Sequence, residues 1–121
     1  MSLSPEQQSR VFALAQDLAR EGRTSELEEF LEHGIPVDLL DGEGNSLLML
    51  AAYHSQGETV EMLIARGADV DLRNARDQSP VAGALFKGAD DVVEILKGAG
   101  ADLDAGTPSA RQAAEIFGRP L

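Results

Sequence analysis

The sequence contains no cysteine, which excludes disulfide bonds, thiolate metal sites and thiol nucleophiles. Aromatic residues are also scarce, with one tyrosine and four phenylalanines, so the core must be built from Leu, Val, Ile and Ala. Cores of this kind suit packed helices, although Val and Ile also suit strands. The chain has 121 residues, of which 43% are hydrophobic, and this is enough for one domain with a real core.

Basic residues are few, because 10 Lys and Arg stand against 21 Asp and Glu and give a net charge of −11. Binding to nucleic acid or to an anionic membrane surface relies on Lys and Arg, so we expect neither as a partner. A strongly acidic surface favours a soluble monomer, and a specific basic partner is the alternative explanation of this charge.

Long apolar segments are missing as well. The longest apolar run, residues 47–53, is too short to span a membrane. Residues 1–10 are polar and lack the apolar segment of a secretory signal. Together with the absence of cysteine, these features lead us to expect a cytoplasmic protein.

The sequence does contain a repeat with a period of 33 residues. Gly34, Gly67 and Gly100 follow one another at this interval, each within a similar phrase such as Arg-Gly-Ala-Asp-Val-Asp at 66–71. Other positions recur at the same step: Leu27, Val60 and Val93; Phe30, Leu63 and Leu96; Val37, Val70 and Leu103; Asp38, Asp71 and Asp104. So many positions at one period predict a stack of similar units.

Each unit is predicted to contain two helices. In the second helix, Val60, Leu63 and Ile64 recur at the spacing of one helical face, and the repeated glycine then ends the helix in a left-handed conformation. The first helix is predicted to start at the N-caps Ser46 and Ser79. The polar segments between the units, residues 38–45 and 71–78, are predicted to be projecting hairpin loops.

A 33-residue unit of a turn and two helices resembles the ankyrin repeat. Residues 41–52 match the opening pattern of that family and residues 66–71 match its close, while the next unit has the same features at 79–84 and 100–104. Residues 47–49 are Leu-Leu-Met where the family has Pro-Leu-His, so the usual Thr/His hydrogen bonding is not expected in that unit. The resemblance covers nearly the whole chain and implies an all-α ankyrin-repeat solenoid.

We predict a single domain over residues 1–121, with the terminal units acting as caps. Its parts are an N-terminal capping helix pair (4–40), two full repeats (41–73 and 74–106) and a C-terminal capping half repeat (107–121).

The cap helices have clear predicted ends. Ser4-Pro5-Glu6-Gln7 is predicted to start the first helix with a partial capping box, and Gly22 to end it. The last helix is predicted to start at Ser109, in the place of Ser79, and to end at Gly118. One face of the first helix is predicted to be apolar: Val11, Leu14, Ala15 and Leu18.

Motifs for chemistry are weak in this sequence. The Asp-x-Asp segments 69–71 and 102–104 have the spacing of calcium ligands but lack the remaining ligands, so we expect them to form turns. The two histidines, His33 and His54, have no ligand at a suitable spacing, and no nucleophile motif or phosphate loop is found. We therefore predict no enzyme activity, no cofactor and no metal site.

In ankyrin repeats the hairpin tips and the first helices form a concave groove that contacts partners. The resemblance implies these contact residues here: Glu43, Asn45, Tyr53, His54, Arg73, Arg76, Gln78, Phe86 and Lys87. Tyr53 and Phe86 supply aromatic surface, and Arg73, Arg76 and Lys87 supply positive charge. Because aromatic residues and Arg dominate interface energetics, this set would suit a protein partner with an apolar spot ringed by acid.

The main hypothesis is thus a non-catalytic protein–protein interaction module. Tyr53 and Phe86 could instead simply pack between neighbouring repeats. Two functional alternatives are a small metal-binding or enzymatic protein that uses acidic clusters, and a structural subunit that self-associates through its C-terminal end. The acidic residues of the second helices are predicted to form an outer back: Glu26, Glu28, Glu29, Glu32, Glu58, Glu61, Asp90, Asp91 and Glu94.

Overall fold

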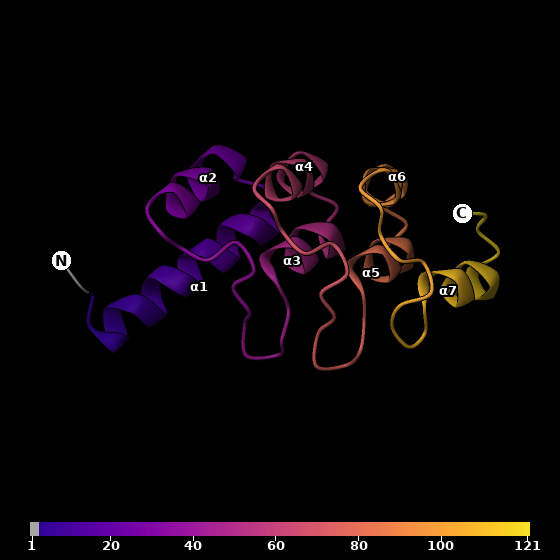
Figure 1. The fold of residues 1–121 in the computed structure, drawn as a ribbon, viewed down its shortest axis with the longest axis horizontal. Coiled ribbons are helices and arrows are strands. Elements are labelled where there is room, and N and C mark those ends of the chain that lie inside the picture. The colour runs from indigo at the N-terminus through magenta and orange to yellow at the C-terminus, as the bar shows by residue number, and fades with distance from the viewer. Residues whose placement is uncertain (1–2) are drawn as a thin grey trace.

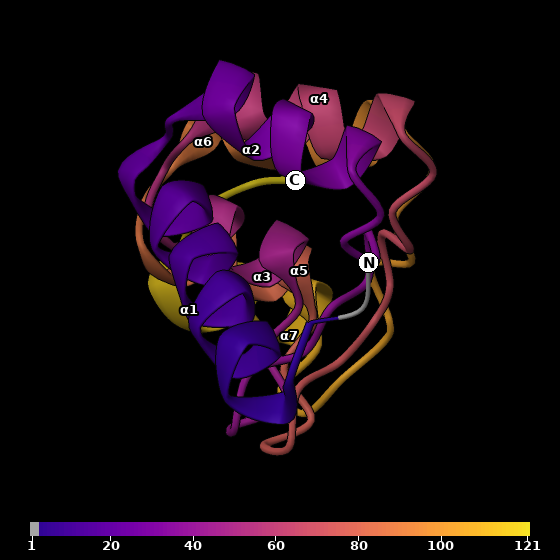
Figure 2. The ribbon, with the colours of Figure 1, turned by 90° about the vertical axis from the view of Figure 1, so that its left-hand side faces the viewer.

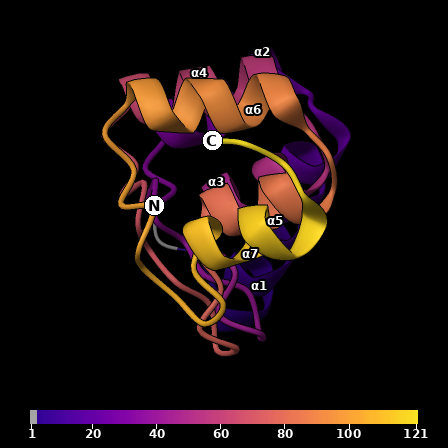
Figure 3. The ribbon, with the colours of Figure 1, turned by 90° about the vertical axis from the view of Figure 1, so that its right-hand side faces the viewer.

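The computed structural model describes residues 3–121, which form α-helices in two layers (Figure 1). The inner layer contains α1 (Pro5–Glu21), α3 (Leu47–Tyr53), α5 (Pro80–Phe86) and α7 (Ala110–Phe117). The outer layer contains α2 (Thr24–Glu32), α4 (Gly57–Ala65) and α6 (Asp90–Gly98). Views along the stack from its two ends show the outer helices lying over the inner ones, with the hairpin loops on one side (Figure 2 and Figure 3). The predicted all-α stack of helix pairs is confirmed.

The inner helices start at side-chain caps, as predicted. The hydroxyl oxygens of Ser46, Ser79 and Ser109 each accept a hydrogen bond from the backbone N–H three residues later, at 3.0, 3.2 and 3.2 Å. At the start of α1, Ser4 and Gln7 form a complete capping box. Each cap satisfies an N–H group that a helix start leaves free, which typically stabilises a helix by about 1 kcal/mol.

The outer helices end at the repeated glycines. Gly34, Gly67 and Gly100 follow α2, α4 and α6 with φ angles of 102°, 90° and 86°. Positive φ angles favour glycine because a Cβ atom would be strained there. The 33-residue spacing of these glycines is therefore the spacing of the helix ends.

Aliphatic residues form the core between the two layers. Leu27, Val60 and Leu63 of the outer helices are fully buried, as are Leu48 and Val81 of the inner helices. Burial of one such side chain stabilises the fold by about 1.5–3 kcal/mol. The recurring apolar positions thus hold each unit against the next.

One residue of the predicted apolar face lies on the surface. The structure buries Ala15 and Leu18 but leaves Leu14 with 53% of its surface exposed. The buried residues of α1 are Ala15, Leu18 and Ala19, and at 100° per residue Leu14 lies at the edge of this stripe, on the side of Leu18. The apolar pattern does not show where the neighbouring helix lies, so it does not give the exposure of Leu14.

The Asp-x-Asp segments build turns, as expected. The side-chain oxygen of Asp69 accepts a hydrogen bond from the N–H of Asp71 at 3.0 Å, and Asp102 does the same for Asp104 at 2.9 Å. Asp38 accepts from the N–H of Asp69 at 3.0 Å and so joins two successive units. These carboxylates therefore have a structural use in the loops.

The outer helices carry an acidic back, defined by the nine residues predicted for it, which are exposed or half-exposed. Arg66 lies among them and donates hydrogen bonds to Glu28 at 3.1 Å and to Glu32 at 2.9 Å. The acidic back is thus a mainly negatively charged surface.

Candidate functional site

A groove of about 450 Å³ lies on the inner layer, between the hairpin loops and α3, α5 and α7. The helices form its floor and the loop tips form its wall. Six of the nine predicted contact residues line it: Glu43, Asn45, Tyr53, Arg76, Gln78 and Phe86. The repeat positions therefore meet in one concave surface.

Aromatic rings form the floor of the groove. The rings of Tyr53 and Phe86 are stacked, with centroids 6.5 Å apart and planes 9° apart. The edge of Phe117 meets Phe86, with centroids 5.7 Å apart. Tyr53 is half-buried between the repeats, but Phe86 keeps 62% of its surface exposed, so packing between repeats does not account for it. Solvent can be displaced from this ring by a bound molecule.

The three predicted cations lie in different settings. Arg76 lines the groove from the loop wall. The Lys87 ammonium nitrogen lies 4.8 Å from the centroid of the Tyr53 ring, a distance typical of a cation–π contact. Arg73 does not line the groove and pairs instead with Asp77 at 3.1 Å on the loop surface. Of the three predicted cations, Arg76 alone therefore lines the groove, while Lys87 lies beside the groove against Tyr53.

His54 lies beside the groove at the end of α3, and it does not line the groove. Its ring meets the Tyr53 ring edge-on, with centroids 5.8 Å apart. Partial burial and then the positive charges of Arg20 and Lys87 lower the pKa of His54 below its ordinary value of 6.5. His54 is therefore a mainly neutral neighbour of Tyr53 near pH 7.

Two exposed large apolar residues of the site were missed by the sequence analysis. Ile116 and Phe117 of α7 line the groove, with 70% and 45% of their surfaces exposed. A signal for them exists, because Ile116 follows the cap Ser109 by the same seven positions that separate Tyr53 from Ser46. The shortened last loop hides this relation when only the 33-residue period is followed.

The comparisons with known proteins agree with this geometry. A family described as ankyrin repeats (3 copies) matches residues 15–107. The chain belongs to the ankyrin repeat family. Ankyrin repeats are generally non-catalytic modules for protein–protein interaction.

The chain is also similar to a Pseudomonas aeruginosa protein that is named as an ankyrin repeat protein. The two are 48% identical over 46 residues, which cover 38% of this chain and 27% of the relative. The similarity thus spans only about a quarter of that relative's length.

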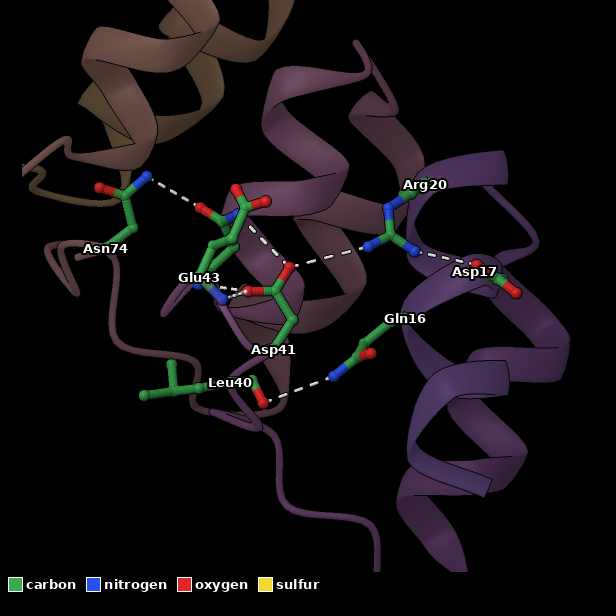
Figure 4. Close-up of polar contacts among 8 residues, drawn as sticks. Gln16, Asp17, Arg20, Leu40, Asp41, Glu43 and Asn74 are labelled. Atoms are coloured by element: carbon green, nitrogen blue, oxygen red, sulfur yellow. Dashed lines mark hydrogen bonds and ion pairs between the residues drawn. The ribbon is translucent and has the colours of Figure 1, made fainter. Parts of the chain in front are cut away.

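The first ankyrin hairpin is held by Asp41 (Figure 4). One carboxylate oxygen accepts hydrogen bonds from the backbone N–H groups of Glu43 and Asn45, both at 2.9 Å. The other oxygen lies 3.7 Å from a guanidinium nitrogen of Arg20, which also pairs with Asp17 at 2.9 Å. Asp41 therefore stabilises the turn of the hairpin and also connects the hairpin to α1.

The second ankyrin hairpin is built in the same way around Asn74, one period after Asp41. The side-chain oxygen of Asn74 accepts from the N–H groups of Arg76 at 2.9 Å and Gln78 at 3.0 Å. Its side-chain nitrogen donates to Asn45 at 2.8 Å, which links the two hairpins (Figure 4). A polar ladder thus holds the wall of the groove, and Asn45 and Gln78 belong to this ladder as well as to the groove lining.

The described part of the chain offers little to a metal ion. Among residues 3–121, no group of three or more His, Cys, Asp and Glu side chains is arranged to hold one. The Nδ1 atom of His33 lies 2.8 Å from the carbonyl oxygen of Glu29 at the end of α2.

Among residues 3–121, no helix combines the length and apolar character that crossing a membrane requires.

Proposed function

We propose that this ankyrin repeat chain is a non-catalytic module that binds a protein partner in the groove. The observation that carries the proposal is the continuous aromatic and aliphatic surface of Tyr53, Phe86, Ile116 and Phe117, of which the last three are exposed. Covering exposed aromatic surface is a major source of binding free energy at interfaces. A partner that covers this surface therefore gains more binding free energy than a partner that binds the acidic back.

The wall of the groove supports the proposal for a second reason. Asp41 and Asn74 hold the two loop tips through hydrogen bonds to their own backbones, and Asn45 joins the tips. A wall that is already ordered loses little entropy when a partner binds. Glu43 and Arg76 are thereby presented from fixed loops.

The test is affinity capture of partners from a lysate, followed by mass spectrometry. The double variant Tyr53→Ala/Phe86→Ala should reduce the captured partner by at least about tenfold, since each aromatic contact is expected to contribute 1–2 kcal/mol. The matched control is Glu61→Ala/Glu94→Ala, which changes two exposed residues of the acidic back and should capture normally. Thermal unfolding of both variants checks that the fold is intact. Equal capture by both variants would refute the groove.

The proposal includes a monomeric state and no nucleic-acid partner, which the net charge of −11 supports. It also includes a cytoplasmic location, which the absence of cysteine supports. Self-association is the competing function, because Ile116 and Phe117 are exposed on α7, the last helix. Light scattering over a hundredfold concentration range distinguishes the two. A constant mass of one chain supports the proposal, whereas a rising mass that Ile116→Ala abolishes supports self-association.

A further inference from the structure

The floor of the groove changes in polarity along the stack. Successive inner helices carry Arg20, Tyr53, Phe86 and Ile116 at the equivalent position, since Tyr53, Phe86 and Ile116 each follow a serine cap by seven residues and Arg20 precedes Tyr53 by one period. Arg20 is engaged by Asp17 and Asp41, so the first position of the row is occupied by ion pairs. At this position of the repeat, apolar side chains are therefore found only from α3 onward, and they are most exposed at α5 and α7.

The charge of the loop tips also changes along the stack. Glu43 and Arg76 occupy the same position in the first and second hairpins, one period apart, and both line the groove. Arg76 precedes the start of α5 and Lys87 caps its end. The exposed ring of Phe86 thus lies on a helix that has a cation at each end.

In the part of the chain that the structure describes, neither of these two cations has a carboxylate oxygen within 4.0 Å. The chain has 10 Lys and Arg residues, and seven of them have a carboxylate oxygen within 4.0 Å: Arg20, Arg23, Arg66, Arg73, Lys97, Arg111 and Arg119. Within residues 3–121, the remaining three are Arg10, Arg76 and Lys87. Arg76 lines the groove, and Lys87 lies beside it over the ring of Tyr53. In a chain with 21 carboxylates this local excess of positive charge is a complementary surface for an acidic group.

We infer that the groove selects a short partner segment that carries a bulky apolar side chain flanked by carboxylates. The apolar side chain packs on Phe86, Ile116 and Phe117. The carboxylates reach Arg76 on one side and Lys87 on the other. Glu43 repels the same carboxylates at the first hairpin, and this repulsion sets the register of the segment over α5 and α7. The inference rests on the proposed function, because it requires the groove to be the binding surface.

Selection from random 12-residue peptides displayed on phage tests this preference without a known partner. The immobilised chain is the target, and binders that also bind Tyr53→Ala/Phe86→Ala are removed. Enrichment of Asp or Glu beside Leu, Ile, Phe or Trp supports the inference. Enrichment of Lys and Arg overturns it while still supporting the groove as a binding surface. If no groove-dependent peptide is enriched, the inference is overturned, and the capture experiment decides the proposed function separately.

Fluorescence anisotropy with the most enriched peptide then tests the two cations. Arg76→Glu and Lys87→Glu should each weaken binding by about tenfold, the effect of losing one charge pair at an interface. Arg10→Glu is the matched control, since it removes the third carboxylate-free cation and makes the same charge change, but Arg10 lies on α1, does not line the groove and makes no cation–π contact with its rings. A peptide with Lys in place of its acidic residues should prefer the Arg76→Glu/Lys87→Glu chain. Equal weakening by all three substitutions would show only an effect of net charge and would overturn the inference.

Discussion

The two ends of the inner face differ in how they use the same position of the repeat. At the first end, Arg20 pairs with Asp17 and Asp41 and ties α1 to the first hairpin. At the other end, Ile116 and Phe117 meet no such partner and stay exposed. At this position of the repeat, the first end therefore carries ion pairs, and the other end carries exposed apolar side chains.

This difference separates stability from binding. The side chain of Asp41 is only 12% exposed and accepts several hydrogen bonds, so the fold depends on it. The exposed surface of Phe86 and Ile116 contributes little to the core, so the fold can tolerate changes there. We expect substitutions at the first end to act on the free energy of unfolding and substitutions at the second end to act on partner affinity.

The largest effect on stability is expected for Asp41→Ala. The substitution leaves the N–H groups of Glu43 and Asn45 without their acceptor and should lower the free energy of unfolding by about 2 kcal/mol. Urea denaturation measures the loss. Asp41→Asn is the control, because its amide oxygen can still accept both bonds, and it should cost less than about 1 kcal/mol. If Asp41→Ala costs no more than Phe86→Ala, the two ends do not differ as we describe.

A smaller effect is expected where Phe86 and Phe117 meet. Each single Ala variant should lower the free energy of unfolding by less than about 1.5 kcal/mol, because both rings are partly in water. A double-mutant cycle should give a coupling of about 0.5–1 kcal/mol for an edge-to-face pair at 5.7 Å. Additive losses in urea denaturation would mean that the rings are apart in solution.

Much of the fold was predictable because repetition makes the local signals redundant. The glycines at 34, 67 and 100 and the serines at 46, 79 and 109 mark helix ends through backbone chemistry that needs no distant contact. The face of α1 was less predictable. The exposure of Leu14 depends on which side of α1 its neighbours cover, and helical periodicity does not contain that information.

The candidate site was predictable in part for a related reason. Tyr53 and Phe86 lie one period apart, and their stacking follows from the stacking of α3 on α5. Ile116 and Phe117 were missed because the loop before α7 is shorter and shifts the numbering by three residues. The position of Arg73 in the repeat predicted that it lies at the groove. Its pairing with Asp77 depends on the side-chain rotamer, which the repeat pattern does not determine.

A still smaller effect is expected for Arg20→Gln at the first end. The Arg20–Asp41 pair is 3.7 Å long, and the Arg20 side chain is 35% exposed, so its loss should cost about 0.5 kcal/mol. Added salt at about 0.5 M should shrink this difference, since it screens exposed charges. Arg23→Gln is the control, because Arg23 and its partner Glu26 are both more than half exposed and should contribute almost nothing. A salt-independent loss at Arg20 would point to packing of its carbon chain instead.

The smallest expected effect on stability comes from the titration of His54, which lies at the end of α3 near both Arg20 and Lys87. Burial is the largest cause of its lowered pKa, followed by Arg20 from the first end and Lys87 from the groove, so NMR should find its titration midpoint below 6.5. Because the folded pKa is lowered, the unfolded chain takes up the proton first as the pH falls, and stability decreases from about pH 6.5 down to the folded pKa. Lys87→Gln should move the midpoint only part of the way toward 6.5, since burial and Arg20 remain. A midpoint at or above 6.5 in the unsubstituted chain would mean that Arg20 and Lys87 do not act together on His54.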